Sequence, residues 1–247
     1  MAELRYPTSG IGTRTEIDQG LKSYMLGVYN YMGLGIGVAA IIVLASFMIP
    51  AVGAVTRTLS FPAMIGLLAL GWFGPKMIYN GSVAKAQGVF WAYVAAWGIG
   101  ISPIVGRYLG VDPSMVMSAF LTASITFGAM SFWGYTSKKD LSGMGNTVMM
   151  IMMGLIIAAL VNLVVSFFTG VTGTAIIISM LISGAFVVLT ALLTAWETQT
   201  VKEMYEIGDT GETATRKSVF GAFLLFGSFV SIFVNLLQIF GFLSSDE

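Results

Sequence analysis

The chain has 247 residues, of which 56% are hydrophobic and 10% are charged, whereas a soluble domain carries about a quarter charged residues. This composition favours lipid as the solvent, and the net charge of zero argues against nucleic acid as a partner. Because the chain has no Cys and no His, disulfides, thiol catalysis and the usual pH-sensing side chain are excluded, and any proton sensing must use carboxylates.

In chain order, residues 1–22 come first; they are polar, mixed in charge and unlike a cleavable signal, so they predict a cytoplasmic tail. Residues 23–247 then predict one membrane domain, because a spanning helix needs about 20 mainly apolar residues and seven runs approach that length. The fold class predicted is all-α, a polytopic bundle of seven transmembrane helices. The predicted spans are 24–49, 60–80, 86–106, 114–134, 147–168, 173–196 and 217–243.

The distribution of Lys and Arg between the two sides of these spans predicts the orientation, since cytoplasmic loops are enriched in both. One side holds only Arg57 and Arg107. The other side holds ten basic residues, so the N-terminus is expected in the cytoplasm and the C-terminus on the opposite side. The ten are Arg5, Arg14, Lys22, Lys76, Lys85, Lys138, Lys139, Lys202, Arg216 and Lys217.

Ionisable side chains inside spans are costly and are therefore candidates for a functional role. Lys76 lies about a turn before the cytoplasmic end of the second span, and Glu197 lies at the cytoplasmic end of the sixth. Their matching depth predicts a pair if the two helices are neighbours. The plain alternatives are that Lys76 extends to the membrane interface and that Glu197 is an exposed helix end.

The seventh span carries a polar stripe, because its polar residues are three or four positions apart and share one helical face. Such a stripe either lines a wet cavity or hydrogen-bonds a neighbouring helix, and the sequence leaves both readings open. The stripe consists of Ser228, Ser231, Asn235 and Gln238.

The residues indicate no catalytic chemistry. Without His or Cys no side chain is present to activate a hydroxyl nucleophile in the usual way, and the chain has no phosphate-binding loop, dinucleotide fingerprint or metalloprotease helix motif. We therefore expect a protein that is not an enzyme and that needs no cofactor.

Four short motifs, in the right order on the right spans, resemble the transmembrane Bax-inhibitor-motif family, also called the Bax inhibitor-1 family, and its bacterial branch in particular. Residues 100–104 read GISPI, similar to the family's G-x-S-P-I, and residues 134–142 read GYTSKKDLS, similar to its Y-T-x-K-x-D-L loop. Residues 195–199 read AWETQ where the family has A-Y-D-T-Q, and residues 236–241 read LLQIFG where it has L-L-x-x-F-G. The likeness runs from about Tyr24 to the C-terminus.

This resemblance implies seven helices with a cytoplasmic N-terminus, placement in the bacterial inner (plasma) membrane, and a passive calcium leak that depends on pH. Two family aspartates, on the sixth and seventh helices, form the proposed sensor, with a basic latch on the second helix. The sixth-helix aspartate falls on Glu197, which becomes a candidate calcium ligand, and the latch is similar in position to Lys76. Ser228, Ser231 and Asn235 complete the expected ion pathway or gate.

The chain departs from the family at the seventh-helix aspartate, which falls on Ser228, because residues 225–233 read LFGSFVSIF where the family has L-Y-L-D-F-I-N-L-F. One carboxylate forms no proton-sharing pair, and calcium loses an anionic ligand. The alternative is a non-transporting regulator that binds a membrane protein, since bacterial relatives are described as modulators of the membrane-anchored protease FtsH.

Overall fold

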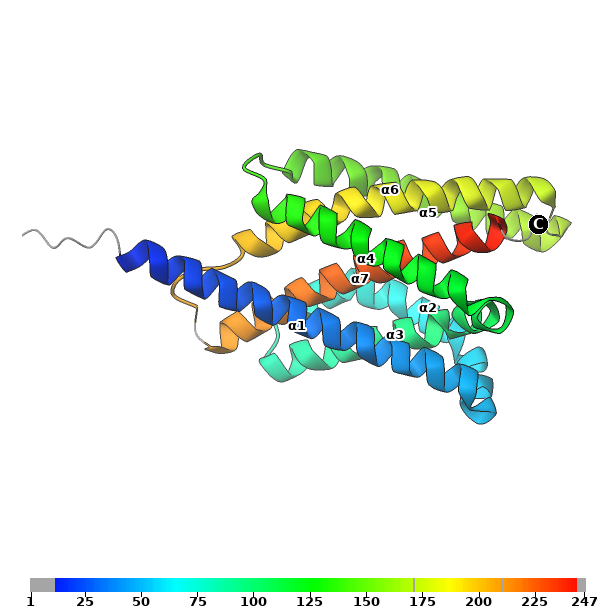
Figure 1. Ribbon diagram of the computed structural model, residues 1–247, viewed down its shortest axis with the longest axis horizontal. Helices are drawn as coiled ribbons and strands as arrows, with labels where there is room; N and C mark the ends of the chain where they lie inside the picture. The colour runs from blue at the N-terminus through cyan, green and yellow to red at the C-terminus, as the bar shows by residue number, and fades with distance from the viewer. Residues whose placement is uncertain (1–11, 171, 210, 244–247) are drawn as a thin grey trace, which may run out of the picture.

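The computed structural model describes residues 12–170, 172–209 and 211–243, and this part of the chain consists of seven long helices without a strand (Figure 1). All seven are long and apolar enough to cross a membrane, which confirms the predicted fold class. The helices are α1 Gly12–Met48, α2 Pro50–Tyr79, α3 Val83–Val111, α4 Pro113–Thr136, α5 Ser142–Thr169, α6 Gly173–Glu203 and α7 Gly211–Leu243.

Two helices begin ten or more residues earlier than the apolar runs indicate. α1 begins at Gly12, within the segment 1–22 predicted as a tail, whereas residues 1–11 lie outside the described part of the chain. α2 begins at Pro50, ten residues before the predicted span 60–80. Its polar first half is helical because the hydroxyls of Thr56, Thr58 and Ser60 donate to carbonyls of their own helix, which removes the cost of burying them in lipid.

α7 forms the centre of the bundle and packs against α1, α2, α3, α4 and α6 (Figure 1). Its most apolar window is 67% buried, whereas that of α5, which packs on α6, is only 6% buried. Large side chains of α7, such as Phe226, Leu225 and Ile232, are fully buried. Conversely, Phe167 and Phe168 on α5 are more than three-quarters exposed, as suits a surface in contact with acyl chains.

The two ends of the bundle differ in charge, and each is named here by its residues. The end where α2, α4 and α6 finish, called the basic end, carries Lys76, Lys202 and Lys217. The opposite end carries Arg57 and Arg107 and is called the Arg107 end. The membrane orientation itself remains a prediction from this charge difference.

Glycine allows α4 and α6 to approach closely beside the site described below. A Cβ on Gly134 of α4 would overlap the backbone carbonyl of Ala195 on α6. Since a backbone atom has no rotamer with which to move away, this contact requires glycine. The approach fixes the position of α6 one turn from Thr198 and two residues from Glu197.

Candidate functional site

The carboxyl group of Glu197 lies between α6 and α7, opposite the middle of α7. Glu197 is only 6% exposed, and the hydroxyl of Ser228 on α7 donates a 2.6 Å hydrogen bond to its Oε2. Ser228 is equally buried, at 5% exposed. The structure therefore brings together the two residues that the family resemblance assigned to the paired acidic positions.

The expectation that Glu197 sits at the end of the sixth helix is wrong, because α6 continues to Glu203. Glu197 lies six residues, about 9 Å, inside that end. The polar residues that follow it are buried in the bundle rather than exposed: Gln199 Nε2 donates to the carbonyl of Lys139, and its Oε1 accepts from the backbone N–H of Leu141. These bonds tie α6 to the loop between α4 and α5.

Lys76 lies in the last turn of α2, as predicted, but is not near Glu197. Its side chain is exposed, and the ion pairs among the described residues involve Lys217 and neither Lys76 nor Glu197. α2 packs against α1, α3 and α7, whereas α6 packs against α4, α5 and α7. The predicted Lys76–Glu197 pair is therefore absent, because the two helices are not neighbours.

A tyrosine that sequence reasoning missed also faces Glu197. Tyr93 of α3 is 8% exposed and lies close enough to Glu197 for an electrostatic interaction. Its hydroxyl would lie 2.5 Å from a Cβ on Gly227, the neighbour of Ser228. Glycine at 227 thus leaves room for the Tyr93 hydroxyl beside the Glu197–Ser228 contact.

A second polar chain, also missed, connects α1 and α4 to Thr198, the residue next to Glu197 on α6. Tyr29 of α1 and Ser131 of α4 are 2.6 Å apart, and Ser131 lies 3.0 Å from the hydroxyl of Thr198. Thr198 and Thr194 each reach the carbonyl four residues back at 2.8 Å. The spacing of Thr190, Thr194 and Thr198 was the available signal for this polar face of α6.

The remaining predicted residues of α7 do not touch Glu197. Asn235 Nδ2 donates to the Ser231 carbonyl at 2.8 Å, within the same helix, and both residues are half-buried. Gln238 lies farther along and accepts a long 3.4 Å contact from Ser183 of α6. The polar stripe thus faces α6 at Ser228 and at Gln238.

Glu197 alone is a poor resident calcium site. Calcium takes six to eight oxygen ligands, and a single carboxylate supplies two. No cluster of three or more Asp, Glu, His or Cys side chains occurs in the described ranges.

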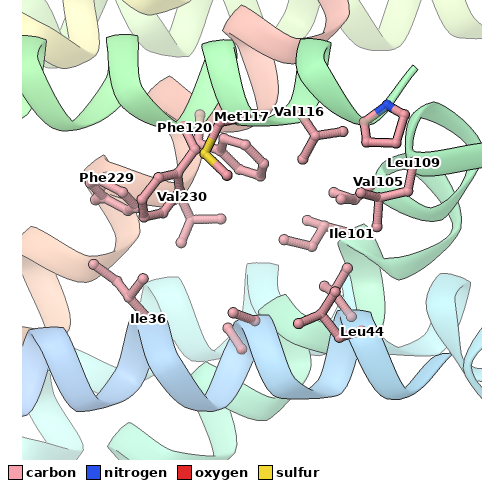
Figure 2. A pocket seen from close by; sticks show the side chains of 15 residues that line it. Ile36, Leu44, Ile101, Val105, Leu109, Val116, Met117, Phe120, Phe229 and Val230 are labelled. Carbon is pink, nitrogen blue, oxygen red and sulfur yellow. The ribbon is translucent and has the colours of Figure 1, made fainter. Parts of the chain in front are cut away.

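The cavities of the bundle differ in chemistry. A cavity of ≈ 400 Å³ between α1, α3, α4 and α7 is lined by aliphatic and aromatic side chains such as Ile36, Val105, Phe120 and Phe229 (Figure 2). It offers no polar group to a cation. A cavity of ≈ 370 Å³ at the Arg107 end is polar, with Ser179, Ser183 and Gln238 in its wall.

The polar cavity is therefore better suited to water or hydrated ions than the apolar one. At the basic end, Lys217 binds Asp209 through contacts of 2.9 and 3.0 Å, with both side chains nearly buried.

Comparison with known proteins identifies relatives over almost the whole chain. The family described as "Inhibitor of apoptosis-promoting Bax1" matches residues 21–245. An uncharacterised protein of Rickettsia prowazekii (strain Madrid E) is 33% identical over 236 residues, covering 91% of each chain. The inner membrane protein YbhL of Escherichia coli (strain K12) is 33% identical over 227 residues, covering 90% of this chain and 92% of its own. A membrane protein of Streptococcus pyogenes serotype M6 is 26% identical over 244 residues, with coverage of 92% and 96%.

Proposed function

Because this chain belongs to the Bax inhibitor-1 family, we propose that it is a pH-dependent calcium leak pathway of the bacterial inner membrane, controlled by Glu197. One observation carries the proposal: a carboxyl group is buried between α6 and α7 with the Ser228 hydroxyl as its donor. The inner-membrane placement follows the relative named above. The calcium selectivity and the pH dependence follow the family.

The physical basis is the cost of a buried charge. A carboxylate in an apolar interior is costly unless it is paired or well hydrogen-bonded, and the described residues provide Glu197 with no cationic partner. Gain or loss of the proton therefore changes the free energy of the closed α6–α7 contact. A negative Glu197 also attracts a cation into the space between the helices.

Within this proposal the other candidate residues take subordinate places. Ser228 holds the carboxyl in the closed state, and Ser231 and Asn235 provide polar lining along α7 when the contact opens. Lys76 is distant in this state, so a latch role for it requires α2 to move towards α6. The proposal does not depend on that role.

The test is calcium-dye flux into proteoliposomes at several pH values. Wild type is expected to leak with a pH dependence that Glu197→Gln, a neutral variant of similar shape, lacks. Thr147→Val is the matched control, because Thr147 is exposed on α5 and bonds only to its own helix at Gly143. Equal flux in wild type, Glu197→Gln and empty vesicles would overturn the proposal.

A second candidate function is regulation of a membrane protein such as the protease FtsH, and the exposed face of α5 favours it. Met149, Met150 and Met153 are each at least half exposed. Methionine suits adaptable contact surfaces because its side chain is flexible and polarisable. α5 packs on α6, so this methionine face is directed towards the lipid or towards another membrane helix.

Purified FtsH in nanodiscs provides the test of this second function. Co-purification with wild type that is lost in Met149→Ala/Met150→Ala/Met153→Ala supports it. A triple substitution to Ala at Leu181, Val188 and Ile177, exposed on α6, is the matched control. Failure of FtsH to retain the wild-type chain, or equal retention of all three chains, rejects the methionine face as its binding surface.

A further inference from the structure

Three polar side chains of α6 face α7 at regular intervals. Successive members of the set Ser183, Thr190 and Glu197 are seven residues apart, which places them on one helical face at intervals of about 10 Å. All three are buried, with exposed fractions of 4%, 1% and 6%. They define a polar seam, the name used below for these residues and their partners on α7.

The partners follow from two contacts that fix the register of the antiparallel helices. Ser183 contacts Gln238 near the Arg107 end, and Glu197 contacts Ser228 farther in. The intermediate level, Thr190, therefore lies opposite residues 231–235 of α7. The polar members of that segment are Ser231 and Asn235.

Thr190 supplies an independent observation at this middle level. Its hydroxyl is buried and has no protein hydrogen-bond partner. A buried hydroxyl without a partner is costly, and in proteins such groups are satisfied by ordered water. The side-chain N–H of Asn235 donates to the Ser231 carbonyl, and the Oδ1 of Asn235 is an acceptor for such a water.

The outer end of the seam opens into the polar cavity of ≈ 370 Å³, in whose wall Ser183 and Gln238 lie. Arg107 and Tyr108 of α3 form another part of that wall. Water in this cavity is thus two helical turns from the hydroxyl of Thr190, and Thr190 is two turns from Glu197.

The side of Glu197 towards the basic end is different, because apolar residues follow it along the α6–α7 contact. Val201, one turn farther along α6, and Val28 of α1 are fully buried and meet at Gly221 of α7. Beyond them the Lys217–Asp209 ion pair holds the basic end together. Along the α6–α7 contact, the residues between Glu197 and the basic end are therefore apolar, whereas the polar chain of Thr198, Ser131 and Tyr29 lies between α6, α4 and α1.

We propose that Glu197 exchanges its proton with the medium at the Arg107 end, through water held in the α6–α7 seam with the Thr190 hydroxyl as its midpoint. This rests on the proposed function for the role of Glu197, but not on calcium flux. The carboxylic acid gives its proton to a seam water, leaving a carboxylate, and the excess proton passes along the waters to the cavity. The titratable groups near Glu197 are Tyr93 of α3, which faces it, and Tyr29 of α1, which is linked to Thr198 through Ser131 of α4.

The first test measures proton exchange directly. The infrared C=O band of protonated Glu197, assigned by its loss in Glu197→Gln, shifts when reconstituted protein is mixed with D₂O at acidic pH. Thr190→Val keeps the shape and removes the hydroxyl, and it is expected to slow this shift by about tenfold, the effect of losing one hydrogen-bond relay. Thr56→Val is the control, because Thr56 is also buried, its hydroxyl bonds within its own helix, and that helix, α2, packs against α1, α3 and α7.

The second test assigns the side of entry and uses the absence of native Cys. Ser183→Cys, modified with a bulky methanethiosulfonate, plugs the cavity at the Arg107 end. Tyr79→Cys places the same group in a ≈ 230 Å³ cavity at the basic end. We expect slow deuterium exchange only in the modified Ser183→Cys protein.

Slow exchange only in the Tyr79→Cys protein, or an unchanged rate in both Thr190→Val and plugged Ser183→Cys, overturns the proposal. The infrared band is measured without a calcium gradient, so this experiment tests the proton path independently of the calcium leak. The proton path can be supported when no leak is found, and a leak can be found when the proton path is rejected.

Discussion

The hydroxyl of Ser228 donates a 2.6 Å hydrogen bond to Glu197, at the position that the family resemblance assigns to a second acidic residue. An exchange of carboxylate for hydroxyl keeps the contact between α6 and α7 but changes its chemistry. A hydroxyl donates to a charged or a neutral carboxyl, so the contact persists over a wider range of pH than one between two carboxylates.

Removal of this donor is expected to destabilise the bundle. Ser228→Ala leaves the buried Glu197 carboxyl without its hydroxyl partner and should cost about 1–3 kcal/mol. Thermal unfolding in detergent measures the loss. Ser231→Ala is the matched control on the same helix, since Ser231 is half-buried and the Asn235 bond uses its backbone carbonyl; equal losses in both variants would contradict the assigned role of Ser228.

Ser228→Asp is expected to make calcium flux more steeply dependent on pH. Two carboxylates in the space of the present hydrogen bond repel each other when both are charged, so the closed contact then requires a shared proton. Proteoliposome flux across a pH series checks this. Ser228→Asn, similar in size but unable to ionise, should leave the steepness unchanged; the same steepness in Asp and Asn variants would refute the argument.

Close packing of α4 and α6 gives a prediction about glycine. Gly134→Ala forces a Cβ into the Ala195 carbonyl and should lower stability by about 1–3 kcal/mol through overpacking. Gly128→Ala lies two turns earlier on α4 and meets open space, so it should cause no loss. Thermal melts of the two variants in the same detergent show whether the destabilisation is specific to the close contact of α4 with α6 or follows any Gly→Ala substitution on α4.

Removal of one member of the Lys217–Asp209 ion pair should destabilise the protein more than removal of both. Asp209→Ala leaves Lys217, whose side chain is 11% exposed, without its closest partner and is expected to cost about 3–5 kcal/mol. The double variant Asp209→Ala/Lys217→Met removes both charges and should recover most of that loss. Unfolding of single and double variants completes a cycle; additive losses would show that the two residues do not interact.

The loop between α3 and α4 gives a pH prediction outside the membrane spans. Asp112 accepts hydrogen bonds from the side chain of Ser114 and from its backbone N–H, the latter at 2.9 Å, and these bonds lower the pKa of the Asp112 carboxyl below the ordinary value of 3.8. Its stabilising effect is thus present above the ordinary pKa and is lost as pH falls through the lowered one. The melting temperature of wild type should fall more than that of Asp112→Asn between about pH 5 and about pH 2; parallel curves would argue against the cap.

The number of helices was predictable because apolar length alone determines it. The contact between Glu197 and Ser228 was also within reach, since the family motifs aligned both residues with a known pair. The position of Glu197 along α6 was not, because polar residues after it imitate a helix end. Their burial depends on Gln199 bonding to the loop before α5, which is a tertiary contact.

The Lys76–Glu197 pair failed for a related reason. Depth along the membrane is readable from the sequence, but the order of helices around the bundle is not. Only the packing of α2 and α6 on different neighbours reveals that the two side chains lie apart.

The central place of α7 has a consequence for assembly in the cell. α7 follows the other six helices in the chain, and it is the helix around which five of them pack. Those helices therefore enter the bilayer before their common partner is made, with polar groups such as Glu197 and Ser183 turned towards lipid or one another. During synthesis this intermediate is the stage most exposed to wrong pairing and to quality-control proteases.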